Sequence, residues 1–234
     1  MRMRGIDTTQ EHPVTPSPER WNAAFHSHGA HTSDAPIGVV VERAEGAWIH
    51  GADGKRYLDL LAGIGVANLG HTAPEVVTAV EQQNRRHHHV MVYGEYIQEP
   101  QALYAEELVR VMPPGLDRVY FVSTGAEAVE GALKLARKAT GRRGFVAFGG
   151  AYHGDTFGAL SVAGNAVYQE PFQPLLGPVT LLPFGDPEAL EAIDGSVAGV
   201  IVEPVQGEGG VREPPAEFLP ALRRRCTETG ALLI

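Results

Sequence analysis

The amino-acid sequence predicts an α/β fold in which a mostly parallel sheet carries helices on both faces, preceded by a small N-terminal β/α segment. From about residue 99 onward, short continuous apolar runs alternate with amphipathic stretches, a pattern typical of a parallel sheet buried on both faces. Of the 234 residues, 44% are hydrophobic and 20% are charged, so the chain can build a core. Its length suits one large domain or two small ones, at roughly 150 residues per domain.

Residues 1–36 are expected to form an extended N-terminal arm with at most one helical turn, around residues 21–25. Prolines are frequent in this region and apolar periodicity is weak, which favours irregular backbone. His26, His28 and His31 have a spacing that a metal ion could use, but no cysteine or carboxylate completes the set. A flexible polar arm is the favoured interpretation, and no metal site is predicted.

Residues 37–98 are expected to form a small β/α segment. Its expected strands are three short apolar runs, at residues 39–41, 47–49 and 57–60. Asp53 and Gly54, between the last two runs, favour a hairpin turn. Pro74 is placed to open a helix that reaches Gln83.

Residues 99–234 are expected to alternate between helices and strands. The expected helices cover residues 101–111, 126–138, 187–193 and 217–229, and the expected strands cover residues 119–122, 145–148, 179–182, 199–203 and 231–234. The final run has the pattern of the start of a buried strand. A domain rarely stops inside a core strand, so we expect the chain to be the first part of a longer domain. The alternative is a short last strand that completes the sheet.

Charge and cysteine content restrict the partners and the compartment. Asp plus Glu is 28 and Lys plus Arg is 19, which gives a formal net charge of −9. No basic face is indicated, so nucleic acid and anionic membrane are not expected as partners. No run approaches the roughly 18 apolar residues of a membrane span, and no signal peptide is predicted. With a single cysteine, Cys226, no intrachain disulfide can form, and a cytoplasmic protein is expected.

Three polar clusters follow three of the expected strands. They begin at Ser123, at Gly149 and at Glu203. Ligands of open parallel sheets bind beyond the carboxyl ends of the strands. The coincidence of polar clusters with strand ends therefore predicts a binding site at this edge of the sheet.

The first cluster has the composition of an anion site. Ser123 or Thr124 can cap the following helix, and Gly125 lets a ligand approach the backbone. Free N–H groups at a helix N-terminus favour a phosphate. The alternative is a simple capping box, because Thr124 and Glu127 have that spacing and would satisfy the same donors.

The second cluster places an aromatic ring and an imidazole on a glycine-flanked loop. Gly150 and Gly154 would let a planar ligand lie against Tyr152, although the ring could equally pack over a strand end. His153 and Asp155 are poorly spaced to share a metal ion. The chain also lacks a Gly-x-Ser-x-Gly elbow, so hydrolase chemistry is not expected.

The third cluster contains two acids with different surroundings. Glu203 is expected at a strand tip, where its carboxylate could meet a ligand ring or support a neighbouring group. Glu208 lies on a glycine-rich loop and is free to pair with an arginine. The alternative for Glu208 is an ordinary solvated loop acid.

Taken together, these segments resemble the class III pyridoxal-phosphate-dependent aminotransferases of fold type I. The resemblance runs from about residue 38 to residue 234. It rests on ordered blocks of sequence: Gly51-Ala-Asp-Gly-Lys-Arg-Tyr-Leu-Asp59, Gly63-Ile-Gly-Val-Ala-Asn-Leu-Gly-His71, Phe121-Val-Ser-Thr-Gly-Ala-Glu-Ala-Val-Glu130, Tyr152-His-Gly-Asp-Thr156 and Glu203-Pro-Val-Gln-Gly-Glu-Gly-Gly210. It implies that residues 37–98 contribute to the small domain and the substrate side. Residues 99–234 would be the first part of the large domain that binds pyridoxal phosphate (PLP).

The resemblance also implies roles for individual residues. The residues that would contact the cofactor are Thr124, Gly125 and Ala126 at its phosphate, Tyr152 stacked on its ring, His153 beside the ring, and Glu203 in the same pocket. Ile64 would approach the substrate, and Glu208 is similar to the family's gate glutamate, which pairs with a distal arginine. Asp155 departs from the family pattern, because arginine is common at this position; Ser123 and Val129 depart likewise, since asparagine is common there.

The family's catalytic residues are not found in this chain. The acid that pairs with the pyridine nitrogen would follow Ile234, and the Schiff-base lysine would lie further along. The lysines present, Lys55, Lys134 and Lys138, do not stand at the family's position. Transamination needs a lysine amine, so we expect the chain alone to be inactive.

The resemblance implies an aminotransferase that moves an amino group between an amine or amino acid and a 2-oxo acid. It also implies a homodimer when the protein is intact. One alternative is an aminomutase, decarboxylase or epimerase on the same scaffold. Another is a non-catalytic fragment that binds PLP or phosphate, or that serves in assembly.

Overall fold

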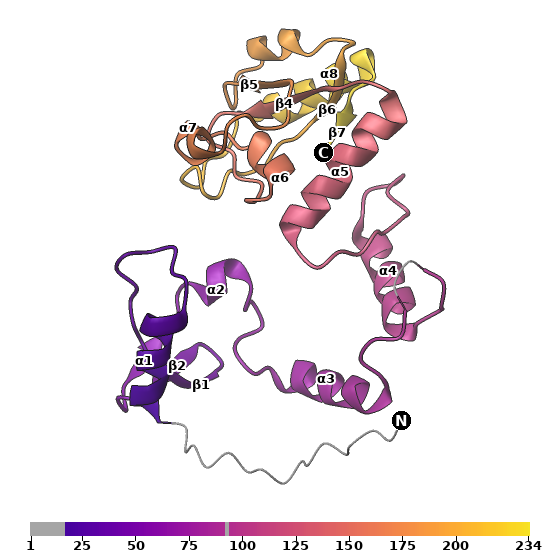
Figure 1. Cartoon of the computed structure of the whole chain (residues 1–234). Coiled ribbons are helices and arrows are strands. Elements are labelled where there is room, and N and C mark those ends of the chain that lie inside the picture. The colour runs from indigo at the N-terminus through magenta and orange to yellow at the C-terminus, as the bar shows by residue number, and fades with distance from the viewer. Residues whose placement is uncertain (1–16, 92–93) are drawn as a thin grey trace, which may run out of the picture. The chain divides into compact units, whose positions relative to one another are not determined.

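A computed structural model describes residues 17–91 and 94–234 of the chain (Figure 1). The chain divides into two compact units, Met1–Gln98 and Glu99–Ile234. The part of the expected N-terminal arm that covers residues 1–16 lies outside the described residues.

The N-terminal unit begins its described part with a longer helix than the sequence predicts. Helix α1 covers Pro18–His28, and the Ser17 hydroxyl at its N-cap accepts a hydrogen bond from the Arg20 N–H at 3.3 Å. The expectation of at most one helical turn here was wrong. Ser17 and Pro18 provide a cap and a first position suited to a helix, and this local signal outweighs the weak apolar periodicity.

A three-stranded antiparallel sheet follows, in the order β1-β2-β3. Its strands are β1 (Val41–Glu45), β2 (Trp48–Gly51) and β3 (Arg56–Leu58). The turn between β2 and β3 contains Gly54, with φ of +79°, and Asp53, whose carboxylate accepts a hydrogen bond from the Lys55 N–H at 3.1 Å. The predicted hairpin turn is confirmed. The short helix α2 (Ala62–Gly65) and the helix α3 (Pro74–Arg86) complete the unit.

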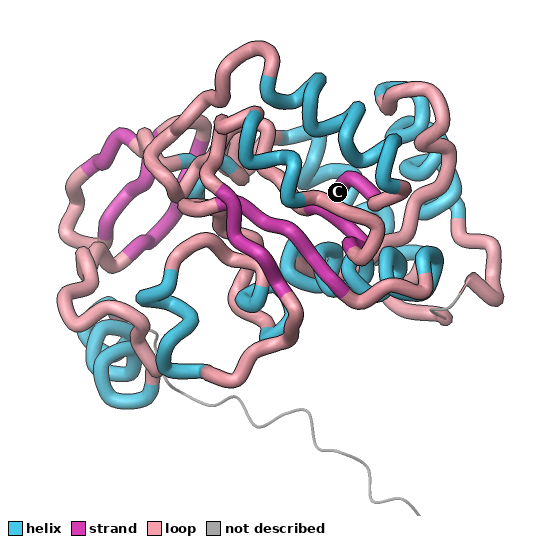
Figure 2. Tube along the Cα trace, turned by 90° about the horizontal axis from the view of Figure 1, so that it is seen from above, coloured by secondary structure: helices cyan, strands magenta, loops and turns pink. Residues whose placement is uncertain are grey.

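The C-terminal unit is built on a four-stranded sheet in the order β5-β4-β6-β7, and every neighbouring pair is parallel. Figure 2 shows the strands of the chain in magenta and the helices in cyan. The strands are β4 (Gly144–Phe148), β5 (Val179–Leu182), β6 (Val197–Val200) and β7 (Leu232–Leu233). Strand β6, one of the two inner strands, is buried along its whole length. The predicted parallel sheet is confirmed.

Helices cover both faces of this sheet, as predicted. The helices of the unit are α4 (Glu99–Val111), α5 (Gly125–Thr140), α6 (Phe157–Ser161), α7 (Ala166–Gln169) and α8 (Phe218–Thr229), with 3-10 helices η1 (Glu170–Phe172) and η2 (Glu188–Ala192). On one face, Leu133 and Ala136 of α5 pack against Phe145 and Ala147 of β4. On the other face, the core is formed by β4, η2 and α8. There the rings of Phe148 and Phe218 pack edge to face, with 5.4 Å between their centroids.

The structure corrects several of the expected elements. The strand expected at residues 39–41 shares only its last residue with β1, which covers Val41–Glu45. Residues 119–122 belong to neither sheet; Tyr120 is 83% exposed, and the Phe121 ring stacks on Tyr104 of α4. An apolar run becomes a strand only when a neighbour offers a hydrogen-bonding edge, and this segment has none in the described residues. The helix expected at 187–193 is the 3-10 helix η2. The strand expected at 199–203 is β6, which begins at Val197 and ends at Val200, so Glu203 lies beyond the strand rather than at its tip.

Within residues 17–91 and 94–234, no helix has both the length and the apolar character needed to cross a membrane.

Candidate functional site

A cavity of about 770 Å³ lies at the N-terminal end of α5. It is lined by the first turn of α5 and by the loop after β4: Thr124, Gly125, Ala126, Val129, Tyr152, His153, Gly154, Asp155 and Thr156. The structure therefore brings together the first and second polar clusters of the sequence. The first cluster follows an extended segment rather than the strand that was expected.

The first turn of α5 contains the capping box that the sequence allows. The Thr124 hydroxyl accepts a hydrogen bond from the Glu127 N–H at 3.1 Å. The Glu127 carboxylate in turn accepts from the N–H groups of Ser123 and Thr124, at 2.8 and 3.1 Å. This arrangement satisfies three backbone donors, but in the described residues it leaves the N–H groups of Gly125 and Ala126 without a protein partner. The cap and an anion site are thus compatible.

The loop after β4 lies directly on this turn. Gly154 has a φ of +113°, and a Cβ at this position would come within 2.7 Å of the Ala126 Cβ. In contrast, a Cβ on Gly125 would meet no atom within 4 Å. Backbone thus approaches backbone on one side of the turn, while the space beside Gly125 is open to a ligand.

Glu130 fixes the same loop from the side of the helix. One of its carboxylate oxygens accepts hydrogen bonds from the Thr156 hydroxyl at 2.6 Å and from the Gly158 N–H at 2.8 Å. No role was predicted for this residue from the sequence. Its only signal there is a carboxylate on the helix that follows the phosphate-like turn, one turn beyond Glu127.

Tyr152 is held at two points. Its backbone N–H donates to Glu203 at 2.8 Å, and its hydroxyl donates to Asp155 at 2.8 Å. The pKa of Tyr152 is raised, first because the hydroxyl donates to the Asp155 carboxylate and then because of burial and the charges of Asp155 and Glu208. The phenol is therefore protonated near neutral pH.

His153 is a neutral imidazole near neutral pH. Burial lowers its pKa, and the negative charge of Glu203 opposes this shift only in part. Its Nε2 atom is buried and has no hydrogen-bond partner in the described residues. His153 lines the cavity as a residue, while this ring nitrogen lies beneath the surface.

Glu203 connects the second and third polar clusters. One oxygen of its carboxylate accepts from Tyr152 N–H, and the other accepts from Gly207 N–H at 3.0 Å. It does not line the 770 Å³ cavity. In this geometry Glu203 supports the loop that carries Tyr152.

The two residues expected on the substrate side lie in different units. Glu208 lines a smaller cavity of about 300 Å³ together with Tyr152, Asp155 and Tyr168. Glu208 makes no ion pair with any residue that the structure describes, so the arginine implied by the resemblance is not found there. Ile64 belongs to the N-terminal unit, where it has a φ of +60° in α2 and is 85% exposed.

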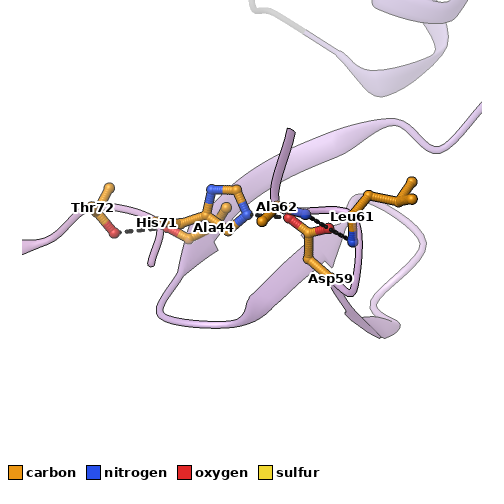
Figure 3. Close-up of polar contacts among 6 residues, drawn as sticks. All are labelled: Ala44, Asp59, Leu61, Ala62, His71 and Thr72. Carbon is orange, nitrogen blue, oxygen red and sulfur yellow. Dashed lines mark hydrogen bonds and ion pairs between the residues drawn. The ribbon is translucent and has the colours of Figure 1, made fainter. Parts of the chain in front are cut away.

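The partly buried carboxylate of Asp59 fixes the turn that precedes Ile64, and its polar contacts are drawn in Figure 3. Asp59 accepts hydrogen bonds from the N–H groups of Leu61 and Ala62, both at 2.9 Å, and its other oxygen lies 2.7 Å from His71 Nε2. These contacts lower the pKa of Asp59, the hydrogen bond with His71 first. This pair was not predicted from the sequence, because the two residues are twelve positions apart and no motif joins them.

The sequence is similar to a family of known enzymes. The sequence profile of the family described as "Aminotransferase class-III" matches residues 29–234. An acetylornithine aminotransferase of Methanopyrus kandleri is 48% identical over 197 residues, which is 84% of this chain and 50% of the relative. A LysW-aminoadipate semialdehyde/glutamate semialdehyde transaminase of Sulfolobus acidocaldarius is 41% identical over 198 residues, which is 84% of this chain and 50% of the relative.

A solved structure has the same fold. The ornithine aminotransferase of Toxoplasma gondii superposes with a TM-score of 0.81 at 30% identity, covering 93% of this chain and 52% of that one. The chain spans about half the length of the curated relatives it matches.

Proposed function

The chain belongs to the class III aminotransferases of fold type I, and on this premise we propose that its protein moves an amino group between an amine or amino acid and a 2-oxo acid. The cofactor of this family is pyridoxal 5′-phosphate. The observation that carries the proposal is the cavity at the N-terminus of α5, where two backbone donors lie free beside a tyrosine ring.

The residues around this cavity suit the cofactor. The free N–H groups of Gly125 and Ala126, with the Thr124 hydroxyl, would hold the phosphate at the positive end of the helix dipole. Tyr152 would lie against the pyridine ring. His153, which lines the same cavity, would lie beside the ring.

Bound PLP supplies an electron sink that eases removal of a proton from the carbon bearing the amino group. The residues of this chain bind and orient the cofactor. Thr124, Gly125 and Ala126 set the position of the phosphate, and Tyr152 sets the plane of the ring. Glu203 acts indirectly, because both of its carboxylate oxygens hold loop backbone.

On the substrate side we assign Ile64 and Glu208. The names of the relatives favour an acylated diamino acid or an amino-acid semialdehyde system as the substrate class. A homodimer and a cytoplasmic location complete the proposal. The buried free thiol of Cys226 supports a reducing compartment.

The test uses the full-length gene product. PLP is titrated against the purified protein while the cofactor's visible absorbance is followed, and amino transfer from acetylornithine to 2-oxoglutarate is then measured. Saturable binding with multiple turnovers is expected. Absence of saturable PLP binding would overturn the proposal, whereas binding without transfer would argue against this substrate class.

A further inference from the structure

The side chain of Tyr152 has a hydrogen-bonded partner that no part of the proposed function uses. The backbone of Tyr152 is fixed by Glu203. The residue as a whole is 38% exposed and lines both the 770 Å³ and the 300 Å³ cavities. The contact that determines where the hydroxyl points is the 2.8 Å hydrogen bond to Asp155.

The backbone beneath this contact is firmly placed. Gly154 lies against Ala126 of α5, and Thr156 donates to Glu130 on the same helix. Asp155 lies between these two anchored residues, so its carboxylate starts from a fixed backbone position. A ring tethered to such a carboxylate loses rotational freedom before any ligand binds.

The chemistry of the pair favours a strong tether. A hydrogen bond from a phenol to a carboxylate is charge-assisted, and such bonds are roughly twice as strong as neutral ones. The phenol keeps its proton, because the neighbouring carboxylate raises the pKa of Tyr152. The bond therefore persists across the neutral pH range.

We propose that Asp155 is a positioning residue that holds the Tyr152 ring at the wall of the cavity, where the pyridine ring of PLP would lie. The inference rests on the proposed function and adds a residue to it. Asp155 would act through the Tyr152 hydroxyl and would not itself contact the reacting atoms.

A competing account treats Asp155 only as a negative charge beside a site for an anion. The two accounts predict opposite results. Removing a repulsive charge would tighten PLP binding in both Asp155→Ala and Asp155→Asn. Removing a tether would weaken PLP binding in Asp155→Ala. Asp155→Asn would keep most of the PLP affinity, because the asparagine carbonyl can still accept a hydrogen bond from the Tyr152 hydroxyl.

The experiment is a double-mutant cycle on the full-length gene product. PLP dissociation constants are measured for the wild type, Asp155→Ala, Tyr152→Phe and the double variant. We expect each single variant to bind about three- to tenfold more weakly. The double variant should be no weaker than Tyr152→Phe alone, since the same hydrogen bond is lost. Glu213→Ala, which removes an exposed acid outside the cavity, should leave binding unchanged.

A second measurement reads the hydrogen bond without cofactor. Tyrosine ionisation is followed by ultraviolet absorbance at alkaline pH. Asp155→Ala should lower the midpoint of one tyrosine, and Tyr152→Phe should remove that same transition.

The failures can be told apart. A wild type that binds PLP, together with an Asp155→Ala variant of equal or higher affinity, overturns the inference alone. The inference also falls if Asp155→Ala weakens binding further in the Tyr152→Phe background. A wild type that does not bind PLP overturns the proposed function and the inference together.

Discussion

Gly125 is the residue at which phosphate binding and helix formation can be separated. Replacement by aspartate places a negative charge in the open space beside the two free N–H groups. We expect Gly125→Asp to weaken PLP binding at least tenfold, or about 1.4 kcal/mol, because the carboxylate repels the phosphate. The helix itself should not suffer, since an acid in the first turn interacts favourably with the helix dipole.

Gly125→Asn is the matched control, because asparagine has the same shape without the charge. Titration of PLP against both variants of the full-length protein, with thermal melts, makes the comparison. We expect Gly125→Asn to bind more tightly than Gly125→Asp. Unchanged affinity in Gly125→Asp would mean that residues 123–126 serve only as a helix cap.

His153 should make the protein less stable under mildly acidic conditions. Burial lowers its folded-state pKa below the ordinary value of about 6.5. As the pH falls below about 6.5, the unfolded chain takes up a proton that the folded protein does not. Stability is therefore greatest above this pH and is lost as the pH falls towards the folded-state pKa.

The measurement is the histidine ring-proton NMR titration, assigned with a His153→Gln variant. The same variant should show a smaller loss of denaturant stability between about pH 6.5 and 5. A His153 midpoint at or above 6.5 would show that burial does not control this imidazole.

At the scale of secondary-structure elements, α5 offers two leucines in opposite environments. Leu133 is 2% exposed and packs on the sheet, whereas Leu135 is 63% exposed on the other side of the helix. We expect Leu133→Ala to lower the free energy of unfolding by about 2–5 kcal/mol, because it removes buried contacts and leaves a cavity.

Leu135→Ala is the control, since it has the same chemistry, the same helix and no core contact. It should change stability by no more than about 0.5 kcal/mol. Urea unfolding followed by circular dichroism measures both. Equal losses in the two variants would contradict the assigned packing face.

Elements with a strong local signal could be predicted from the sequence. The i, i+3, i+4 apolar pattern and the Thr124 cap define α5, and Pro74 marks the start of α3. Residues 119–122 have the same apolar character as β4 but form no strand, because strand formation depends on a partner edge that local sequence does not encode. The short helix α7 was also missed; tertiary hydrogen bonds fix it, such as those from the Gln169 amide to the carbonyls of Leu160 and Ala163.

The sequence allowed residues of the candidate site to be predicted, but it did not indicate the hydrogen bonds that these residues make. Thr124 and Tyr152 were named from sequence and line one cavity. The hydrogen bond from Tyr152 to Glu203 joins residues 51 positions apart, and nothing in the spacing indicates it. The parallel sheet creates this proximity by placing the ends of β4 and β6 side by side.

At the scale of the whole chain, the placement of the lysines predicts no turnover by the 234-residue chain alone. Lys55 is paired with Asp53 at 3.1 Å in the hairpin turn, and Lys134 and Lys138 are exposed on α5. None of them lines the 770 Å³ cavity. The chain expressed alone and supplied with PLP should therefore transfer no amino groups, in contrast to the full-length gene product.

Assays of both proteins under identical conditions test this expectation. Lys55→Arg, Lys134→Arg and Lys138→Arg variants of the full-length protein should retain activity. Multiple turnovers by the 234-residue chain, abolished by one of these substitutions, would identify that lysine as catalytic and refute the prediction.

The contacts of Glu203 and Gln206 have a consequence for protein engineering. Glu203 holds the Tyr152 backbone, and the Gln206 amide donates to the Gly149 carbonyl at 3.0 Å. These hydrogen bonds join the loop at 149–156 to the loop at 203–210, so each loop depends on the other for its conformation. Replacing only one of the two loops with that of a homologue of different specificity would break the hydrogen bonds between them. Replacing both loops together would preserve these hydrogen bonds.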